Sequence, residues 1–109
     1  MTMDGFRARV TRSDTGSRIE LAGTVNRMAK EELEGAYTEA SQSPGEIALD
    51  FTNVDYINST GIAVIVGVLA MARAEERSMG AYGLSDHYRE VFEITRLSDF
   101  IHIHETSDK

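Results

Sequence analysis

The chain has 109 residues, 41% of them hydrophobic and 27% charged, with 18 acidic against 11 basic side chains and a formal net charge of -7. This length and composition fit one folded domain and exclude disordered, collagen-like and low-complexity chains. Because the chain has no cysteine, disulfides, thiolate nucleophiles and Cys-ligated metal sites are excluded too. Both halves of the chain share the acidic excess, so we expect no basic surface for nucleic acid.

Nothing in the sequence predicts export or a membrane span. The first residues lack the basic patch and the apolar run of a secretory signal. The longest apolar run, 62–72, has 11 residues, whereas a membrane-spanning helix needs about 20. We therefore expect a cytoplasmic protein with no membrane contact.

The first part of the chain predicts a hairpin followed by a helix. Residues 6–13 and 19–23 alternate apolar and polar side chains on either side of the turn formers 13–17, which is typical of two antiparallel strands. Asn26 is a candidate N-cap for a helix over 27–41.

Strands and helices alternate in the rest of the chain. We expect a strand over 46–51, a polar loop over 52–58, a helix over 59–77, a strand over 79–84, a helix over 86–96 and a strand over 101–104. This order predicts a single α/β domain over residues 1–109, with a partly parallel sheet whose first hairpin is antiparallel.

The helix over 59–77 is apolar on two sides. One stripe, expected to pack onto the sheet, is formed by Ile62, Ile65, Val66 and Leu69, and nearly opposite lie Val64, Val68 and Met71. Between them runs a line of small residues: Ala63, Gly67, Ala70 and Ala74. Two interpretations remain open, namely burial against another helix of this chain or a partner face that begins beside Ser59.

The segment Asn58-Ser59-Thr60-Gly61 stands where the expected loop meets this helix. The hydroxyls of Ser59 and Thr60 therefore lie at the positive end of the helix, near unsatisfied N–H groups. Simple N-capping explains such residues, since Asn, Ser and Thr are preferred caps. A phosphorylation site would use the same position, because a phosphoserine adds a charge of about -1.5 to -2.

Several segments of the chain resemble the STAS domains, in particular the small bacterial anti-sigma factor antagonists. The central resemblance lies in Asp50-Phe51 and in residues 54–67, from Val54-Asp55-Tyr56 through Asn58-Ser59-Thr60-Gly61 to Val66-Gly67. Residues 23–26 resemble the loop before the first helix of the family, and 83–97 its third helix region. The resemblance implies one STAS domain, a mixed sheet with the alternating helices packed mainly on one face.

The same resemblance implies a regulatory protein that is not an enzyme and holds no cofactor or metal. Such a protein binds an anti-sigma factor serine kinase when unphosphorylated, is switched off by phosphorylation, and is restored by a PP2C-type phosphatase. Ser59 matches the phosphoacceptor, with Thr60 as the fallback. The docking residues would be Asn26, Asn58, Thr60, Gly61 and Val64. We expect a monomer or a weak homodimer.

Two departures from the family pattern keep an alternative open. Asn26 and Asn58 stand where family members often carry Asp, which removes negative charge but keeps hydrogen-bonding capacity. The alternative is a STAS scaffold or assembly module that binds partners without phosphorylation. A nucleotide-binding protein is a weaker hypothesis, because the sequence has no Gly-rich phosphate loop.

Two histidines near the end of the chain are a candidate metal pair. His102 and His104 are two residues apart on an expected strand, so they share a face, and Glu105 or His87 would complete a ligand set. The favoured interpretation is that both histidines face solvent.

Overall fold

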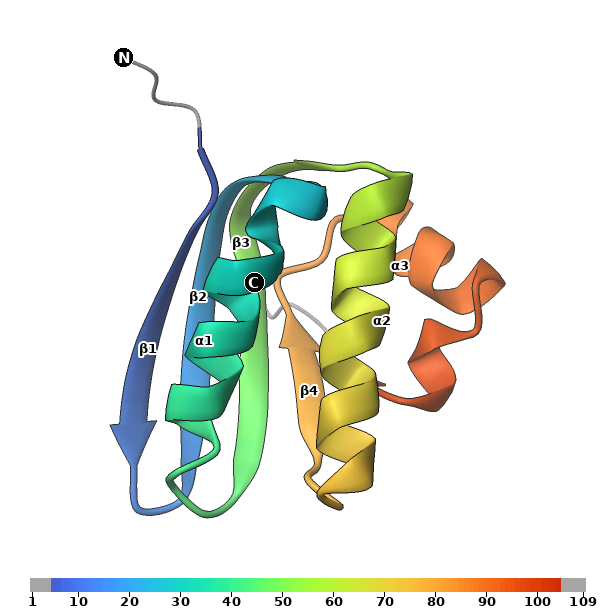
Figure 1. Cartoon of the computed structure of the whole chain (residues 1–109). Coiled ribbons are helices and arrows are strands. Elements are labelled where there is room, and N and C mark those ends of the chain that lie inside the picture. Colours follow the sequence, from blue (N-terminus) through green and yellow to red (C-terminus); the bar gives the residue numbers. More distant parts are fainter. Residues whose placement is uncertain (1–4, 105–109) are drawn as a thin grey trace.

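A mixed sheet of five strands forms the centre of the computed structural model, which describes residues 5–104 (Figure 1). The strands lie side by side in chain order: β1 (Arg7–Ser13), β2 (Gly16–Val25), β3 (Glu46–Ile57), β4 (Met79–Tyr82) and β5 (His102–Ile103). β1 pairs with β2 in antiparallel fashion, and the other three pairings are parallel. The expected α/β class with an antiparallel first hairpin is confirmed.

The helices cover one face of this sheet. They are the 3-10 helix η1 (Arg27–Ala29), α1 (Lys30–Ala40), α2 (Ser59–Ala74), α3 (Asp86–Ile94) and the 3-10 helix η2 (Leu97–Asp99). Figure 1 shows α1 and α2 in front of the sheet, with α3 beyond α2. Side chains alternate along a strand, and the buried Ile47, Leu49 and Phe51 of β3 all point to the helix side. The expectation that the helices pack mainly on one face is confirmed.

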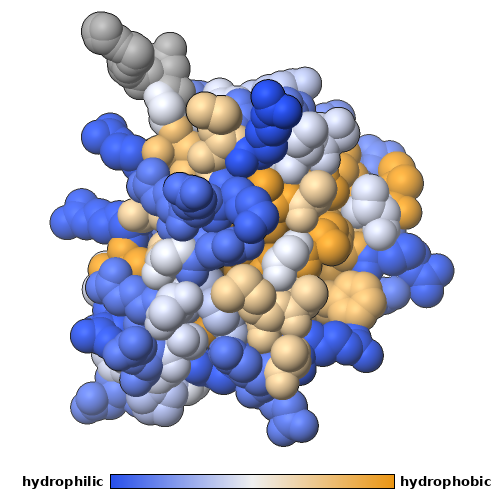
Figure 2. Space-filling model, viewed as in Figure 1, coloured by the Kyte–Doolittle hydropathy of each residue, from blue (hydrophilic) through white to orange (hydrophobic). Residues whose placement is uncertain are grey.

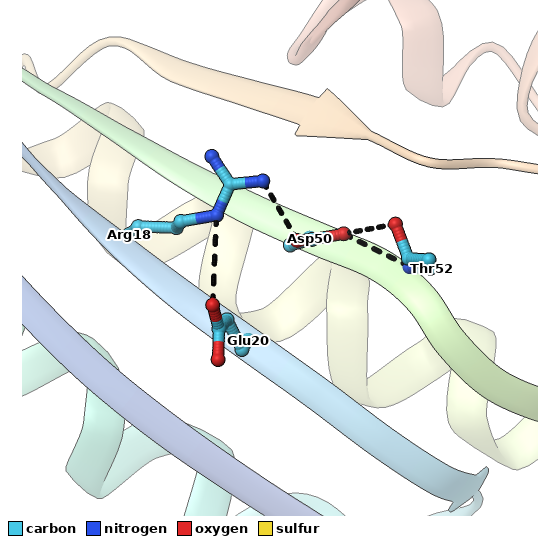
Figure 3. A network of polar contacts seen from close by, with 4 residues as sticks. All are labelled: Arg18, Glu20, Asp50 and Thr52. Atoms are coloured by element: carbon cyan, nitrogen blue, oxygen red, sulfur yellow. Dashed lines mark hydrogen bonds and ion pairs between the residues drawn. The ribbon is translucent and has the colours of Figure 1, made fainter. Parts of the chain in front are cut away.

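The other face of the sheet presents polar side chains, and Figure 3 shows its centre. Arg18 Nη2 on β2 donates to Asp50 Oδ2 on β3 over 2.7 Å, and Arg18 Nε lies 3.9 Å from a carboxylate oxygen of Glu20. The backbone N–H and the hydroxyl of Thr52 both donate to Asp50 Oδ1, over 2.9 and 2.6 Å. Asp50 therefore links the two central strands through charge-assisted hydrogen bonds.

These contacts make the stability of the fold depend on pH through Asp50. Burial alone would raise the pKa of this carboxyl, but the hydrogen bonds from Thr52 and the Arg18 guanidinium outweigh it and hold the pKa below its ordinary value of 3.8. A lowered pKa in the folded state means that the carboxylate stabilises the fold at neutral pH, and that this contribution is lost as the pH falls below about 4.

We expect Asp50→Asn to lower the free energy of unfolding at neutral pH, and the difference from the parent protein to shrink below about pH 4. Urea unfolding at several pH values measures both quantities. Asp55→Asn is the control, since the exposed side chain of Asp55 makes no hydrogen bond or ion pair within the described residues. A difference that stays constant with pH would contradict the role given to Asp50.

The sequence led us to expect a loop over 52–58, but most of this segment belongs to a strand. β3 continues to Ile57, because β2 pairs with it as far as Val25 opposite Ile57. The pairing shifts register between Glu20 and Ala22 and again between Gly23 and Thr24 of β2, and at each shift β3 carries one extra residue. The polarity of this segment reflects exposure at the end of the sheet, which does not prevent strand pairing.

The expected orientation of α2 is confirmed only in part, since Ile65 and Leu69 of the predicted stripe are buried but Val66 is not. The buried side chains of this helix are Val64, Ile65, Val68, Leu69 and Ala72, whereas Val66, expected against the sheet, is 45% exposed. A helix that is apolar on most sides has no unique amphipathic direction, so tertiary packing decides which stripe is buried. Although α2 is apolar, no helix within residues 5–104 is long and apolar enough to cross a membrane.

Candidate functional site

The first turn of α2 is fixed by Asn58. Its backbone is extended, with φ -96° and ψ -176°, and its side-chain oxygen Oδ1 accepts the N–H of Gly61 over 2.8 Å. Its carbonyl oxygen accepts the N–H of Ile62 over 2.9 Å. The residue that caps α2 is thus Asn58, which leaves the hydroxyls of Ser59 and Thr60 free for other roles.

The loop between β2 and η1 lies directly against this turn. The predicted capping role of Asn26 is confirmed: it is the N-cap of η1, and its side-chain oxygen accepts the N–H of Met28 over 2.8 Å. The N–H of Arg27 donates to Thr60 Oγ1 over 3.0 Å, and the N–H of Asn58 donates to the Val25 carbonyl over 3.2 Å. Two segments more than 30 residues apart in the sequence therefore form one hydrogen-bonded surface.

Thr60 and Ser59 differ sharply in what their hydroxyls do. Thr60 Oγ1 donates to Asn58 Oδ1 over 2.8 Å while it accepts from Arg27, so this hydroxyl joins the two segments. Ser59 is exposed, and its hydroxyl makes no hydrogen bond within residues 5–104. A phosphoryl group on Thr60 would break the tie between the segments, whereas one on Ser59 would not.

Gly61 allows the two segments to approach this closely. A Cβ atom on Gly61 would lie 1.9 Å from the carbonyl oxygen and 2.6 Å from the carbonyl carbon of Val25. Both are backbone atoms of the buried end of β2, so they cannot move aside without breaking the strand. Glycine is thus required here by close approach of the backbone, and not by its own dihedral angles.

Val64 does not fit the docking role expected for it. Its side chain is 8% exposed and belongs to the core formed by α2 and the sheet. Among the expected site residues, the structure brings together Asn26, Asn58, Ser59, Thr60 and Gly61. The Val64 side chain instead points into the core.

The exposed side of α2 extends the surface that begins at Ser59. Ala63, Ala70 and Ala74 of the expected small-residue line are exposed, and Figure 2 shows apolar residues gathered over α2 and toward α3. Further along the helix lies a groove of about 270 Å³, lined by Val66, Leu69, Ala70, Arg73, Thr95, Leu97 and Phe100. A partner that docks at Ser59 and extends along α2 would reach this largely apolar groove.

His102 and His104 share a face, as their spacing predicted, with ring centroids 4.4 Å apart. His104 also stacks on Tyr82 at 4.0 Å and lies 3.5 Å from a carboxylate oxygen of Glu46. Glu105 lies outside the described residues, and the part of the chain that is described holds no group of three or more His, Asp or Glu able to bind a metal ion.

The cap on α2 should contribute measurably to stability. We expect Asn58→Ala to lower the free energy of unfolding by about 1 kcal/mol, because the Gly61 N–H and the Thr60 hydroxyl both lose their acceptor. Asn58→Asp is the control, since it keeps an oxygen at the same place and should cost much less. Thermal unfolding of the two variants measures the difference, and equal losses would contradict the capping role.

The chain matches known proteins over most of its length. The family model described as "Mlab, STAS domain" matches residues 8–103. The chain is 29% identical over 99 residues to the anti-sigma-B factor antagonist of Staphylococcus aureus (strain NCTC 8325 / PS 47), over 90% of this chain and 92% of that protein.

Two solved structures share the fold. The anti-sigma factor antagonist from Mycobacterium paratuberculosis has a TM-score of 0.75 at 18% identity, over 96% of this chain and 90% of that chain. The Bacillus cell fate determinant SpoIIAA in its phosphorylated form has a TM-score of 0.66 at 17% identity, over 94% of this chain and 93% of that chain. Since the family model spans nearly all described residues, the chain belongs to the STAS domain family.

Proposed function

We propose that this protein is an anti-sigma factor antagonist. In its unphosphorylated form it binds an anti-sigma factor that is also a serine kinase, and phosphorylation of Ser59 switches this binding off. The observation that carries the proposal is the exposed Ser59 hydroxyl, which makes no hydrogen bond within the described residues although its neighbours are firmly bonded.

The fixed surroundings of Ser59 suit a switch. A kinase would form a bond between Ser59 Oγ and the γ-phosphorus of ATP, while the bond from that phosphorus to the bridging oxygen breaks, ADP leaves, and the hydroxyl proton passes to a base of the kinase or to water. Neither the Asn58 cap nor the hydrogen bond between Arg27 and Thr60 involves the Ser59 hydroxyl, so the fold would keep its shape after the transfer. The new charge would then act mainly on the partner, through repulsion and a blocked close approach.

The relatives support this role. The Staphylococcus aureus protein is named an anti-sigma-B factor antagonist, and SpoIIAA has been solved in a phosphorylated form. A PP2C-type phosphatase would hydrolyse the phosphoserine to serine and inorganic phosphate and so restore binding. The role is regulatory rather than catalytic, and we place it in the cytoplasm, in a monomer or weak homodimer.

The docking face would consist of the two bonded segments and the exposed side of α2. Asn26, Asn58 and Thr60 hold the segments together, and Gly61 permits their contact. The partner would then lie along α2, over its small exposed residues. Val64 is not part of this face, because it is buried.

Phosphosite mapping tests the proposal. The protein is incubated with a cognate anti-sigma factor serine kinase and ATP, and the phosphate is located by mass spectrometry. We expect it on Ser59 in the parent protein and in Thr60→Ala, and no phosphate in Ser59→Ala. Transfer to a residue other than Ser59 would refute the site, and no transfer by any cognate kinase would refute the switch.

The neutral Asn26 and Asn58 favour a second candidate, a STAS module that binds its partners without phosphorylation. Ser59→Asp separates the two functions. A switch should lose its kinase partner when this charge is introduced, whereas a constitutive scaffold should keep both its partners and its oligomeric state.

A further inference from the structure

Arg27 brings a cation to the edge of the Ser59 surface. Its backbone N–H is held 3.0 Å from Thr60 Oγ1, so its Cα lies beside the residue that follows Ser59. Its side chain is exposed and makes no ion pair with any residue of the range 5–104. An arginine whose main chain is fixed but whose guanidinium has no counter-charge is well placed to pair with an anion that arrives at this surface.

The side chains next to Arg27 and Asn58 supply no second unpaired positive charge. Asn58 is neutral, and its side-chain oxygen already accepts the Gly61 N–H and the Thr60 hydroxyl. Lys30, the next cation along the chain, is already paired with Glu34 at 3.0 Å. Because positions 26 and 58 carry Asn, they offer no carboxylate that would compete for the guanidinium.

We propose that Arg27 is the counter-charge of the phosphorylated state, and that its guanidinium binds the phosphate on Ser59. The inference rests on the proposed function, because it assigns a partner within the chain to the modification proposed there. Guanidinium groups pair with phosphate oxygens through two parallel hydrogen bonds, which a lysine cannot reproduce. The pairing would hold the phosphate against the loop that begins at Asn26.

The test installs phosphoserine at position 59 during translation, through an expanded genetic code, so that no kinase is needed. The second pKa of the phosphate is then measured by ³¹P NMR titration in the parent chain, in Arg27→Gln and in Arg27→Lys. We expect Arg27→Gln to raise this pKa by about half a pH unit, the size of one exposed ion pair. Arg27→Lys should give a smaller increase, because it keeps the charge but loses the paired geometry.

Lys30→Gln is the matched control, since it removes one exposed positive charge three residues away. An unchanged phosphate pKa in Arg27→Gln would overturn the proposal, as would an equal shift in Lys30→Gln, which would indicate a general field instead of a direct contact. Arg27 meets Thr60 through its backbone, so both Arg27 variants should fold, which circular dichroism checks. A protein that no kinase phosphorylates would refute the proposed function and leave this result standing.

Discussion

Replacement of Gly61 by alanine is expected to lower the free energy of unfolding by about 3 kcal/mol. The added methyl group would lie 1.9 Å from the Val25 carbonyl oxygen, and the nearest atoms all belong to backbone that cannot rotate away. Relief of the clash requires α2 to move off the end of β2. The same movement would stretch the contact between Arg27 and Thr60, so the docking surface should change together with stability.

Gly67→Ala is the matched control for this substitution. It lies in the same helix, but a Cβ atom there meets no other atom within 4 Å. Because alanine is the better helix former, Gly67→Ala should raise the free energy of unfolding by about 0.5 to 1 kcal/mol. Urea unfolding of both variants gives the comparison. Two changes of the same sign and size would contradict the claim that close approach explains Gly61.

Phe92→Ala is expected to have the other large effect, a loss of about 4 kcal/mol. The ring of Phe92 is 0% exposed and packs edge to face against Phe51, with centroids 5.7 Å apart, so it joins α3 to the core strand β3. Its removal leaves a cavity and also takes away an aromatic pair.

Phe100→Ala controls for the loss of a phenyl ring as such. Phe100 is 49% exposed and lies under the Arg73 guanidinium at 5.0 Å, so its truncation should cost about 1 kcal/mol or less. Chemical denaturation measures both losses. If Phe92→Ala cost no more than Phe100→Ala, the assignment of α3 to the core would be wrong.

The sequence predicted the elements well where a single periodicity dominates. The hairpin of β1 and β2 follows from alternation, and the predicted cap Asn26 accepts a backbone N–H at the start of η1. The sequence did not predict the packing where two orientations of a helix are equally apolar. In α2 nearly every position is apolar, so the direction that faces the sheet depends on packing against α1 and the strands, which no local pattern contains.

The site was only partly predictable. Cap chemistry and the resemblance to STAS domains located Ser59, but the difference between its hydroxyl and that of Thr60 depends on a contact with Arg27, 33 residues away. Val64 was wrongly expected at the docking face, because the apolar pattern of α2 does not show that this side of the helix is buried as well. The ion pair between Arg18 and Asp50 was not predicted. Strand alternation places each side chain on a face of its strand, but it does not show that the two strands are neighbours.

The affinity of a cognate anti-sigma factor serine kinase for two forms of this chain, with serine or with preinstalled phosphoserine at position 59, tests the central claim most directly. Calorimetry with purified components gives both dissociation constants. The account predicts a Kd at least about 100-fold weaker for the phosphorylated form, because the phosphate brings charge and bulk to the point of contact. Equal affinity of the two forms would contradict it.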